Sequence, residues 1–276
     1  MEQFRRDHLV FDVIDAGPDD GPVVVLLHGF PELNIMWRPV IERLTAQGYR
    51  CLAPLQRGYS PGARPKRRRD YRSAELVADV GALIEASGAH RVHLVGHDWG
   101  AVVAWYVAQQ LPDRLNTLTA LSVPHPAAFV KAFGTSRQAL ASWYMVFFQL
   151  PWLPERLLLH PRAQRGFLDS RTDRALGQAE MTAMRQAGAL TAALNWYRAM
   201  LLSDPRKTGK KVTVPTMYIW SEDDIALRGK GARLCADYVV GDYRFERLHG
   251  SHWLLDEQPE TIAELLLDWI GSHPGD

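Results

Sequence analysis

Short apolar runs bounded by turn-forming residues divide the first 123 residues into predicted strands. The clearest is Val23–Leu27, a continuous apolar run typical of a parallel strand that is buried on both faces. The other predicted strands of this part are residues 11–15, 50–53, 91–95 and 118–123. Helical spacing predicts one helix over Ser73–Ser87, with Ser73 as N-cap and Gly88 just past its end, and another over residues 101–111.

The alternation of strands and helices stops after residue 123. Residues 124–211 are rich in aromatic residues and Met and contain predicted helical segments at 136–150, 171–186 and 190–202, with no convincing strand. Strands resume at 216–220 and Tyr243–Leu248, and an amphipathic helix at 261–270 closes the chain. The pattern predicts an α/β fold with a mostly parallel central sheet flanked by helices. Residues 1–123 and 212–276 would form its core, and 124–211 an inserted helical cap.

Composition narrows the possible partners and the compartment. The 276 residues include 32 Lys and Arg against 31 Asp and Glu, so the net charge favours neither a nucleic-acid nor a membrane partner. The basic run at 64–69 has no interleaved aromatics and is expected to be a solvated loop. No stretch approaches the ~18 apolar residues of a spanning helix, and no signal peptide is recognisable. Cys51 and Cys235 form no CxxC pair or metal-ligand set, so we expect a soluble cytoplasmic protein.

The segment Gly96-His97-Asp98-Trp99-Gly100, directly after a predicted strand, carries the candidate chemistry. It follows the G-x-S-x-G pattern of a nucleophile elbow, whose small flanking residues permit a very tight strand-to-helix turn. Asp98 takes the place of the serine. An aspartate with an ordinary pKa of ~3.9 is ionised at neutral pH and would form an alkyl-enzyme ester by displacement. Such chemistry requires an electrophilic sp³ carbon with a leaving group, as in epoxides and alkyl halides.

Hydrolysis of that ester requires a base for water and an acid that orients the base. Among ten histidines, His252 is the leading candidate because it lies between the last predicted strand and helix, at the carboxyl edge of the sheet. His249 is the alternative. The loop after strand 216–220 offers three adjacent acids, which the residues alone do not separate: Glu222, Asp223 and Asp224.

Backbone N–H groups of Trp99 and Phe30 are expected to form an oxyanion hole. Phe30 belongs to the loop His28-Gly29-Phe30-Pro31, which directly follows the strand Val23–Leu27. His28 and His97 are expected to hydrogen-bond loop backbone and not to act on substrate.

Opening an epoxide leaves an alkoxide that needs a proton, so a hydrogen-bond donor is expected on the cap side of the site. A tyrosine is suitable because it is neutral at pH 7 and carries a donor hydroxyl on an apolar ring. The predicted cap helices contain Tyr144 and Tyr197, although composition alone favours a packing role for each.

Taken together, these motifs resemble an α/β-hydrolase-fold epoxide hydrolase along nearly the whole chain. The family's HGxP loop is similar to residues 28–31, and its GHDWG elbow to residues 96–100. Its two cap tyrosine segments resemble residues 144–149 and 195–198, and its acid loop resembles residues 221–225. The ending His252-Trp253 is also similar. Ser60 departs from the pattern, because it stands where the family's RGYG loop has its second glycine.

The resemblance implies a role for each candidate. Asp98 would attack an epoxide carbon while Tyr144 and Tyr197 hold and protonate the oxygen. His252, oriented by Asp224, would activate water to release a vicinal diol, which selects Asp224 from the three acids. No metal and no organic cofactor are implied. The partners would be a small lipophilic epoxide and water, with a pocket lined by His28, Pro31, Trp99, Phe148, Trp196 and Trp253.

A haloalkane dehalogenase is the nearest alternative, because it shares the aspartate nucleophile and Trp99. One such group places an asparagine where this chain has Phe30, whereas fluoroacetate dehalogenases carry an arginine where it has Trp99. Another group uses a cap tryptophan, for which the candidates are Trp143, Trp152 and Trp196. The paired tyrosines argue against a dehalogenase, since a departing halide needs no proton.

A non-catalytic binder of small apolar molecules is the second alternative. Binding alone would not require the water-activating pair Asp224 and His252. A monomer and a homodimer are equally compatible with the sequence.

Overall fold

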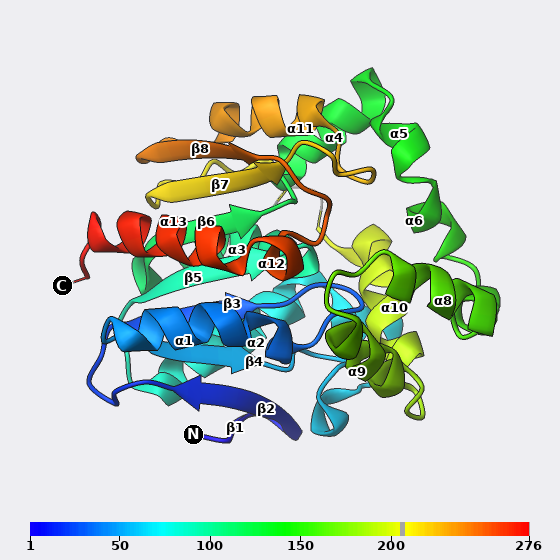
Figure 1. The fold of residues 1–276 in the computed structure, drawn as a ribbon, viewed down its shortest axis with the longest axis horizontal. Coiled ribbons are helices and arrows are strands. Elements are labelled where there is room, and N and C mark those ends of the chain that lie inside the picture. Colours follow the sequence, from blue (N-terminus) through cyan, green and yellow to red (C-terminus); the bar gives the residue numbers. More distant parts are fainter. Residues whose placement is uncertain (205–207, 276) are drawn as a thin grey trace.

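A twisted eight-stranded sheet runs through the centre of the computed structural model, which describes residues 1–204 and 208–275 (Figure 1). The strand order is β1-β2-β4-β3-β5-β6-β7-β8, in which β1/β2 and β2/β4 are antiparallel and every other neighbouring pair is parallel. The strands are β1 Gln3–Arg6, β2 Leu9–Ala16, β3 Val23–Leu27, β4 Arg50–Pro54, β5 Val92–His97, β6 Leu115–Leu121, β7 Thr216–Ser221 and β8 Tyr243–Leu248. The predicted α/β class with a mostly parallel sheet is confirmed.

Helices cover both faces of the sheet and explain why its central strands are buried. Every residue of β3 and β5 is buried, as expected for parallel strands between two helical layers. One layer consists of α2 (Ser73–Ser87) and α3 (Trp99–Gln110), and the other of α1 (Arg38–Ala46), α12 (Leu254–Glu257) and α13 (Pro259–Gly271). The remaining core segments are η1 Asn34–Trp37, η2 Pro61–Ala63, η3 Arg68–Tyr71, η4 Pro112–Arg114, α11 Gly229–Leu234 and η7 Cys235–Tyr238.

A helical insertion connects β6 to β7. Its elements are α4 Pro126–Thr135, α5 Gln138–Ala141, α6 Trp143–Phe147, α7 Leu153–Leu158, α8 Pro161–Asp169, α9 Arg174–Met184, α10 Ala189–Ala199 and η5 Met200–Leu202. In Figure 1, α6 and α8 to α10 lie beyond the carboxyl ends of the parallel strands. The insertion therefore faces the edge of the sheet at which loops following parallel strands gather.

The single helix predicted over residues 136–150 is wrong. Ser136 has extended backbone angles (φ −151°, ψ −175°) and separates α4 from α5, and Ser142 separates α5 from α6. The Ser136 hydroxyl donates to the Ala132 carbonyl and accepts the N–H of Gln138. Such local bonds give the backbone an alternative to a continuous helix, a competition that apolar spacing does not reveal.

Smaller differences concern ends and short elements. Ser73 was expected to be the N-cap of α2, but it is the first residue of the helix, and Arg72 is the N-cap. Gly88 ends the helix with φ 79°, as expected. Strand β1 and helix α1 were not predicted. In the basic run, residues 66–69 are exposed, and Arg64 bonds the carbonyls of Gly58 and Tyr59. Cys51 and Cys235 are both buried and free.

Candidate active site

Asp98 sits on a tight turn between β5 and α3, with the positive φ of 50° that a side chain rarely adopts. The turn closes because the residues two positions before and after Asp98 are glycines without a side chain. A Cβ on Gly100 would overlap the Leu27 carbonyl oxygen, and one on Gly96 would overlap the Gly100 carbonyl. The two glycines of the elbow are thus required by close backbone approach, and they hold Asp98 at the end of the central strand.

The carboxylate of Asp98 contacts donors from two other loops. The backbone N–H of Phe30, in the loop after β3, donates to its Oδ1 at 2.8 Å, and His252 Nε2 lies 3.5 Å from its Oδ2. Trp99 begins α3, so its N–H belongs to the first turn, which lacks intrahelical acceptors. Burial disfavours the charged carboxylate, but the hydrogen bond and charge of His252, with the Phe30 N–H, hold the pKa of Asp98 below its ordinary value.

His252 is paired with one of the three adjacent acids. Its Nδ1 lies 2.7 Å from Asp224 Oδ2, and the other Asp224 oxygen accepts the N–H groups of Ala226 and Leu227. Burial lowers the pKa of His252, yet the charges of Asp224 and Asp98 and the hydrogen bonds with both raise it well above its ordinary value. The geometry thus brings together Asp98, His252 and Asp224, the last of which was selected from the three acids by the family resemblance.

The other candidates of these loops point elsewhere. Glu222 pairs with His249 at 2.9 Å and with Arg247 at 2.6 Å, and the His249 side chain is exposed. Asp223 is exposed and accepts the N–H of Gly250. Neither His249 nor these two acids faces Asp98.

Tyr144 in α6 and Tyr197 in α10 face each other from two helices of the insertion, with ring centroids 6.1 Å apart. The Tyr197 ring also stands perpendicular to Trp99 at 5.0 Å. Burial, followed by the negative charge of Asp98, raises the pKa of Tyr144 and that of Tyr197 above the ordinary tyrosine value. Both hydroxyls therefore keep their protons at neutral pH and are available as donors.

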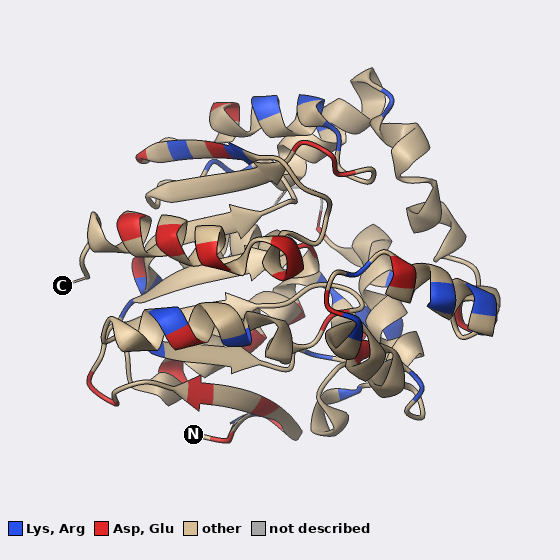
Figure 2. Ribbon diagram, viewed as in Figure 1, with Lys and Arg blue, Asp and Glu red and all other residues tan. Residues whose placement is uncertain are grey.

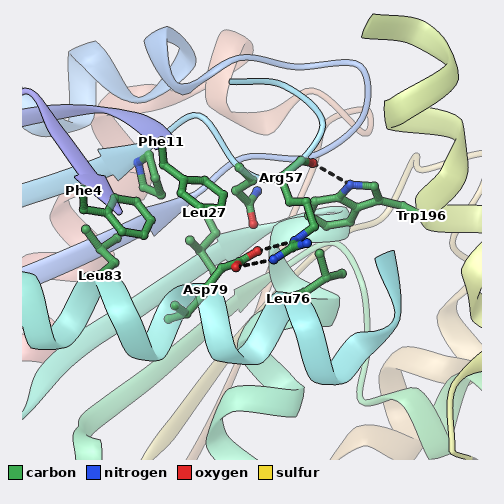
Figure 3. A pocket seen from close by; sticks show the side chains of 11 residues that line it. Phe4, Phe11, Leu27, Arg57, Leu76, Asp79, Leu83 and Trp196 are labelled. Carbon is green, nitrogen blue, oxygen red and sulfur yellow. Dashed lines mark hydrogen bonds and ion pairs between the residues drawn. The ribbon is translucent and has the colours of Figure 1, made fainter. Parts of the chain in front are cut away.

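Helix α10 is fixed to the core through the residue before Tyr197. The Trp196 indole N–H donates to the Arg57 carbonyl at 2.8 Å, and the Arg57 guanidinium makes two 2.6 Å bonds to Asp79 of α2 (Figure 3). Ser60, which stands in the same loop where the family has a glycine, donates a hydrogen bond to Asp12 Oδ2. Pairing of a buried guanidinium with both carboxylate oxygens restricts its geometry, and this arrangement holds Tyr197 over the elbow.

Two cavities, of about 270 and 250 Å³, lie next to Asp98. Asp98, Tyr144 and Tyr197 line both. Of the predicted pocket residues, Trp99 and Trp196 line the larger cavity, whereas the smaller one is lined by Pro31, Phe148 and Trp253, with Phe30 and His252. His28 lines neither cavity. Its ring is fully buried and bonds the Gly29 carbonyl and the Gln56 N–H, the structural role expected from its place in the loop.

Comparison with known proteins connects this geometry to a family. The family described as alpha/beta hydrolase fold matches residues 22–259. The AB hydrolase superfamily protein YfhM of Bacillus subtilis is 34% identical over 95% of this chain and 94% of that protein. Epoxide hydrolase A of Mycobacterium tuberculosis is 32% identical over 94% of this chain and 93% of its own length. The crystal structure of Epoxide Hydrolase A from Mycobacterium thermoresistibile superposes with a TM-score of 0.83 at 28% identity, covering 99% and 98% of the two chains.

The chain belongs to the epoxide hydrolase family of α/β hydrolases. The resemblance found in its motifs is thereby confirmed, as is its assignment as a hydrolase. Within the described residues of this epoxide hydrolase family member, no group of three or more His, Cys, Asp or Glu side chains is arranged to hold a metal ion.

A buried polar network beneath the site was missed by sequence reasoning. His97 bonds Glu32 at 2.8 Å and the His252 carbonyl at 3.0 Å, so it reaches a side chain as well as the expected backbone. Glu32 also lies 3.8 Å from the guanidinium of Arg171, which follows α8 in the cap and further pairs with Glu180 and Asp256. Glu32 directly follows the loop His28–Pro31, so a place near the site could have been predicted for it. The sequence spacing of Arg171, Glu180 and Asp256 does not indicate that their side chains meet.

Proposed function

We propose that this protein hydrolyses a small lipophilic epoxide to a vicinal diol through an ester between a substrate carbon and Asp98. The observation that carries the proposal is that an ionised carboxylate and two protonated tyrosines line the same cavities, which a binding site or a dehalogenase would not require. In this proposal, residues 1–123 and 212–276 supply the nucleophile, base and acid, and the cap, 124–211, supplies the tyrosines.

In the first step, an Asp98 oxygen attacks an epoxide carbon and the carbon–oxygen bond of the ring breaks. The ring oxygen leaves as an alkoxide, which takes a proton from Tyr144 or Tyr197. Burial makes this donation necessary, because water does not reach the oxygen freely in an enclosed site. General acids of this kind contribute roughly 10²–10⁴-fold.

In the second step, His252 takes a proton from water, and the hydroxide attacks the ester carbonyl. The tetrahedral adduct then breaks its bond to the substrate oxygen, which leaves as the second hydroxyl of the diol with the proton that the hydroxide brought in, and Asp98 is a carboxylate again. Esterification removes the negative charge of Asp98, which is one of the causes that raise the pKa of His252. We therefore expect the pKa of His252 to fall once the ester forms, which turns a resting imidazolium into a base. The proton that it releases balances the one lost by the tyrosine. Asp224 stabilises the imidazolium formed again during water attack, and the N–H groups of Phe30 and Trp99 stabilise the tetrahedral oxyanion.

The substrate class follows from the cavity walls. Apart from the reacting groups, the smaller cavity is lined by apolar and aromatic side chains such as Phe30, Phe148, Met181 and Leu190. Such walls favour lipophilic substituents on the epoxide because burying apolar surface is favourable.

The test is diol formation from styrene oxide, with bromide release from 1-bromobutane measured in parallel. We expect diol without bromide, and no diol from Asp98→Ala. Intact-protein mass spectrometry of His252→Gln mixed with styrene oxide should show one added substrate mass, because the ester forms but is not hydrolysed. Bromide without diol would make the protein a dehalogenase, and the absence of an adduct would overturn the ester intermediate.

A further inference from the structure

Exposed apolar side chains are concentrated on one stretch of the insertion. Of the fourteen large hydrophobic residues that are exposed in the described part of the chain, seven lie between residues 130 and 152. Four of them are more than half exposed on α5, α6 and the turn after it: Leu140 (74%), Trp143 (64%), Val146 (69%) and Trp152 (67%). We call residues 126–152 the apolar cap surface. Clusters of exposed apolar side chains are typical of surfaces that bind another protein, a membrane or a ligand.

The charges of the apolar cap surface have one sign. Its 27 residues include Lys131 and Arg137 but no Asp or Glu. Lys131 has a long contact of 3.9 Å to Asp237 and remains half exposed. Figure 2 shows α6 without any charged residue, whereas α8 carries both signs. A net charge near zero for the whole chain therefore conceals a local segment that is apolar and basic.

The same segment forms a wall of the larger cavity. Phe129 and Val130 of α4 and Met145 of α6 line that cavity, so one side of the segment faces the site and the other faces outward. Val130 is itself exposed, as are the cavity-lining residues Met200 and Leu201 of η5. The rim of the cavity thus continues into the apolar cap surface.

We propose that the apolar cap surface docks on a lipid bilayer that carries anionic headgroups. Exposed tryptophans with basic residues and no acids are typical of segments that lie in the membrane interface. A second copy of the chain is a weaker fit, because a surface paired with itself would offer no carboxylate from residues 126–152 to Lys131 and Arg137. Docking would be peripheral, since no described helix has both the length and the apolar character needed to cross a bilayer. If the proposed function holds, a lipophilic epoxide dissolved in the bilayer would reach the cavity rim directly.

Docking is tested by sedimentation of the full chain with phosphatidylcholine vesicles, with and without about one part in three of phosphatidylglycerol. We expect the protein to sediment with the anionic vesicles, and less so in high salt, which screens Lys131 and Arg137. Val146→Glu should weaken the partition by at least about tenfold, the loss expected for one apolar side chain. Val240→Glu is the matched control, because Val240 is exposed to a similar extent (64% against 69%) but lies outside the surface.

The outcomes separate this proposal from the proposed function, because sedimentation requires no turnover. Diol formation from dispersed styrene oxide should be equal in Val146→Glu and wild type, which shows that the variant is folded. Failure of the wild type to sediment with anionic vesicles would overturn the docking proposal, as would equal losses in Val146→Glu and Val240→Glu. A dimer in light scattering that Val146→Glu converts to a monomer would assign the surface to a second copy instead.

Discussion

At the residue scale, the negative charge of Asp98 connects the two halves of the proposed reaction. In the resting site this charge raises the pKa of His252, and the charge of His252 in turn keeps Asp98 ionised. The ordinary aspartate pKa already implies an ionised Asp98, but the charge of His252 could not be assigned in this way, since a histidine near ~6.5 would be mostly neutral at pH 7. The hydrogen bond with Asp224 and the proximity of Asp98 raise the pKa of His252, and both contacts exist only in the folded chain.

This coupling predicts how the reaction responds to pH. Ester formation needs ionised Asp98, whose lowered pKa keeps it charged in mild acid, whereas ester hydrolysis needs neutral His252. As the pH falls through the pKa of His252 in the ester, hydrolysis slows while ester formation continues. Mass spectrometry of samples quenched during turnover should therefore show more esterified protein at about pH 5 than at about pH 8. Equal ester at both values would contradict the assignment of His252 as the base.

The paired tyrosines predict partial and complete losses of activity. Tyr144→Phe or Tyr197→Phe should each slow ester formation by no more than about 10²-fold, because the other hydroxyl still donates. The double variant should lose the full contribution of the acid, about 10²–10⁴-fold. Single-turnover rates measure this. Tyr49→Phe is the control, because the half-buried Tyr49 lies between α1 and β4 and lines neither cavity. Wild-type rates in both single variants would mean that the tyrosines only pack.

At the scale of elements, the strands could be predicted from the sequence far better than the cap helices. The limits of β3 follow from an uninterrupted apolar run bounded by turn residues, because this strand is buried along its whole length. Those of β8 also match the predicted range, although β8 is an edge strand without a fully buried residue. In α5 and α6 the large apolar residues Leu140, Trp143 and Val146 face the solvent. The helix predicted over residues 136–150 is interrupted at Ser142, whose hydroxyl accepts a hydrogen bond from the Gln138 side chain. The helical spacing of apolar residues does not distinguish positions that face a cavity or the solvent from positions in a packed core.

Arg171, between α8 and α9, joins the cap to the core through a buried cluster of carboxylates, and this predicts a pH-dependent stability. Burial raises the pKa of Glu180 in this cluster to about 9. In the unfolded chain Glu180 loses its proton near pH ~4.3, so its contribution to folding stability declines as the pH rises from there to about 9. Glu180→Gln removes this penalty. We expect the melting temperature to decline less between pH 7 and pH 9 in Glu180→Gln than in wild type.

An exposed carboxylate provides the control for that prediction. Glu264 lies on the solvent side of α13, and Glu264→Gln should decline with pH as the wild type does. If Glu180→Gln and Glu264→Gln show the same slope by differential scanning calorimetry, Glu180 is not the group that titrates.

At the scale of the whole molecule, the sequence predicts the fold and the nucleophile because both are encoded locally. The elbow around Asp98 is five consecutive residues, and His252 follows the last strand directly. The buried network and the apolar cap surface are different in kind, because they depend on which side chains from distant segments meet and which remain uncovered. Total charge and composition average over those features.

The cap leaves the core after β6 and returns at β7, and these are neighbouring parallel strands of the sheet. An insertion at such a junction can change in length or sequence without altering the order of the strands. In the proposed reaction, the residues that hydrolyse the ester belong to the core, whereas many residues of the cavity walls belong to the insertion, so the two sets can change independently. New substrate specificities would then arise from changes in the segment between β6 and β7, while Asp98 is kept.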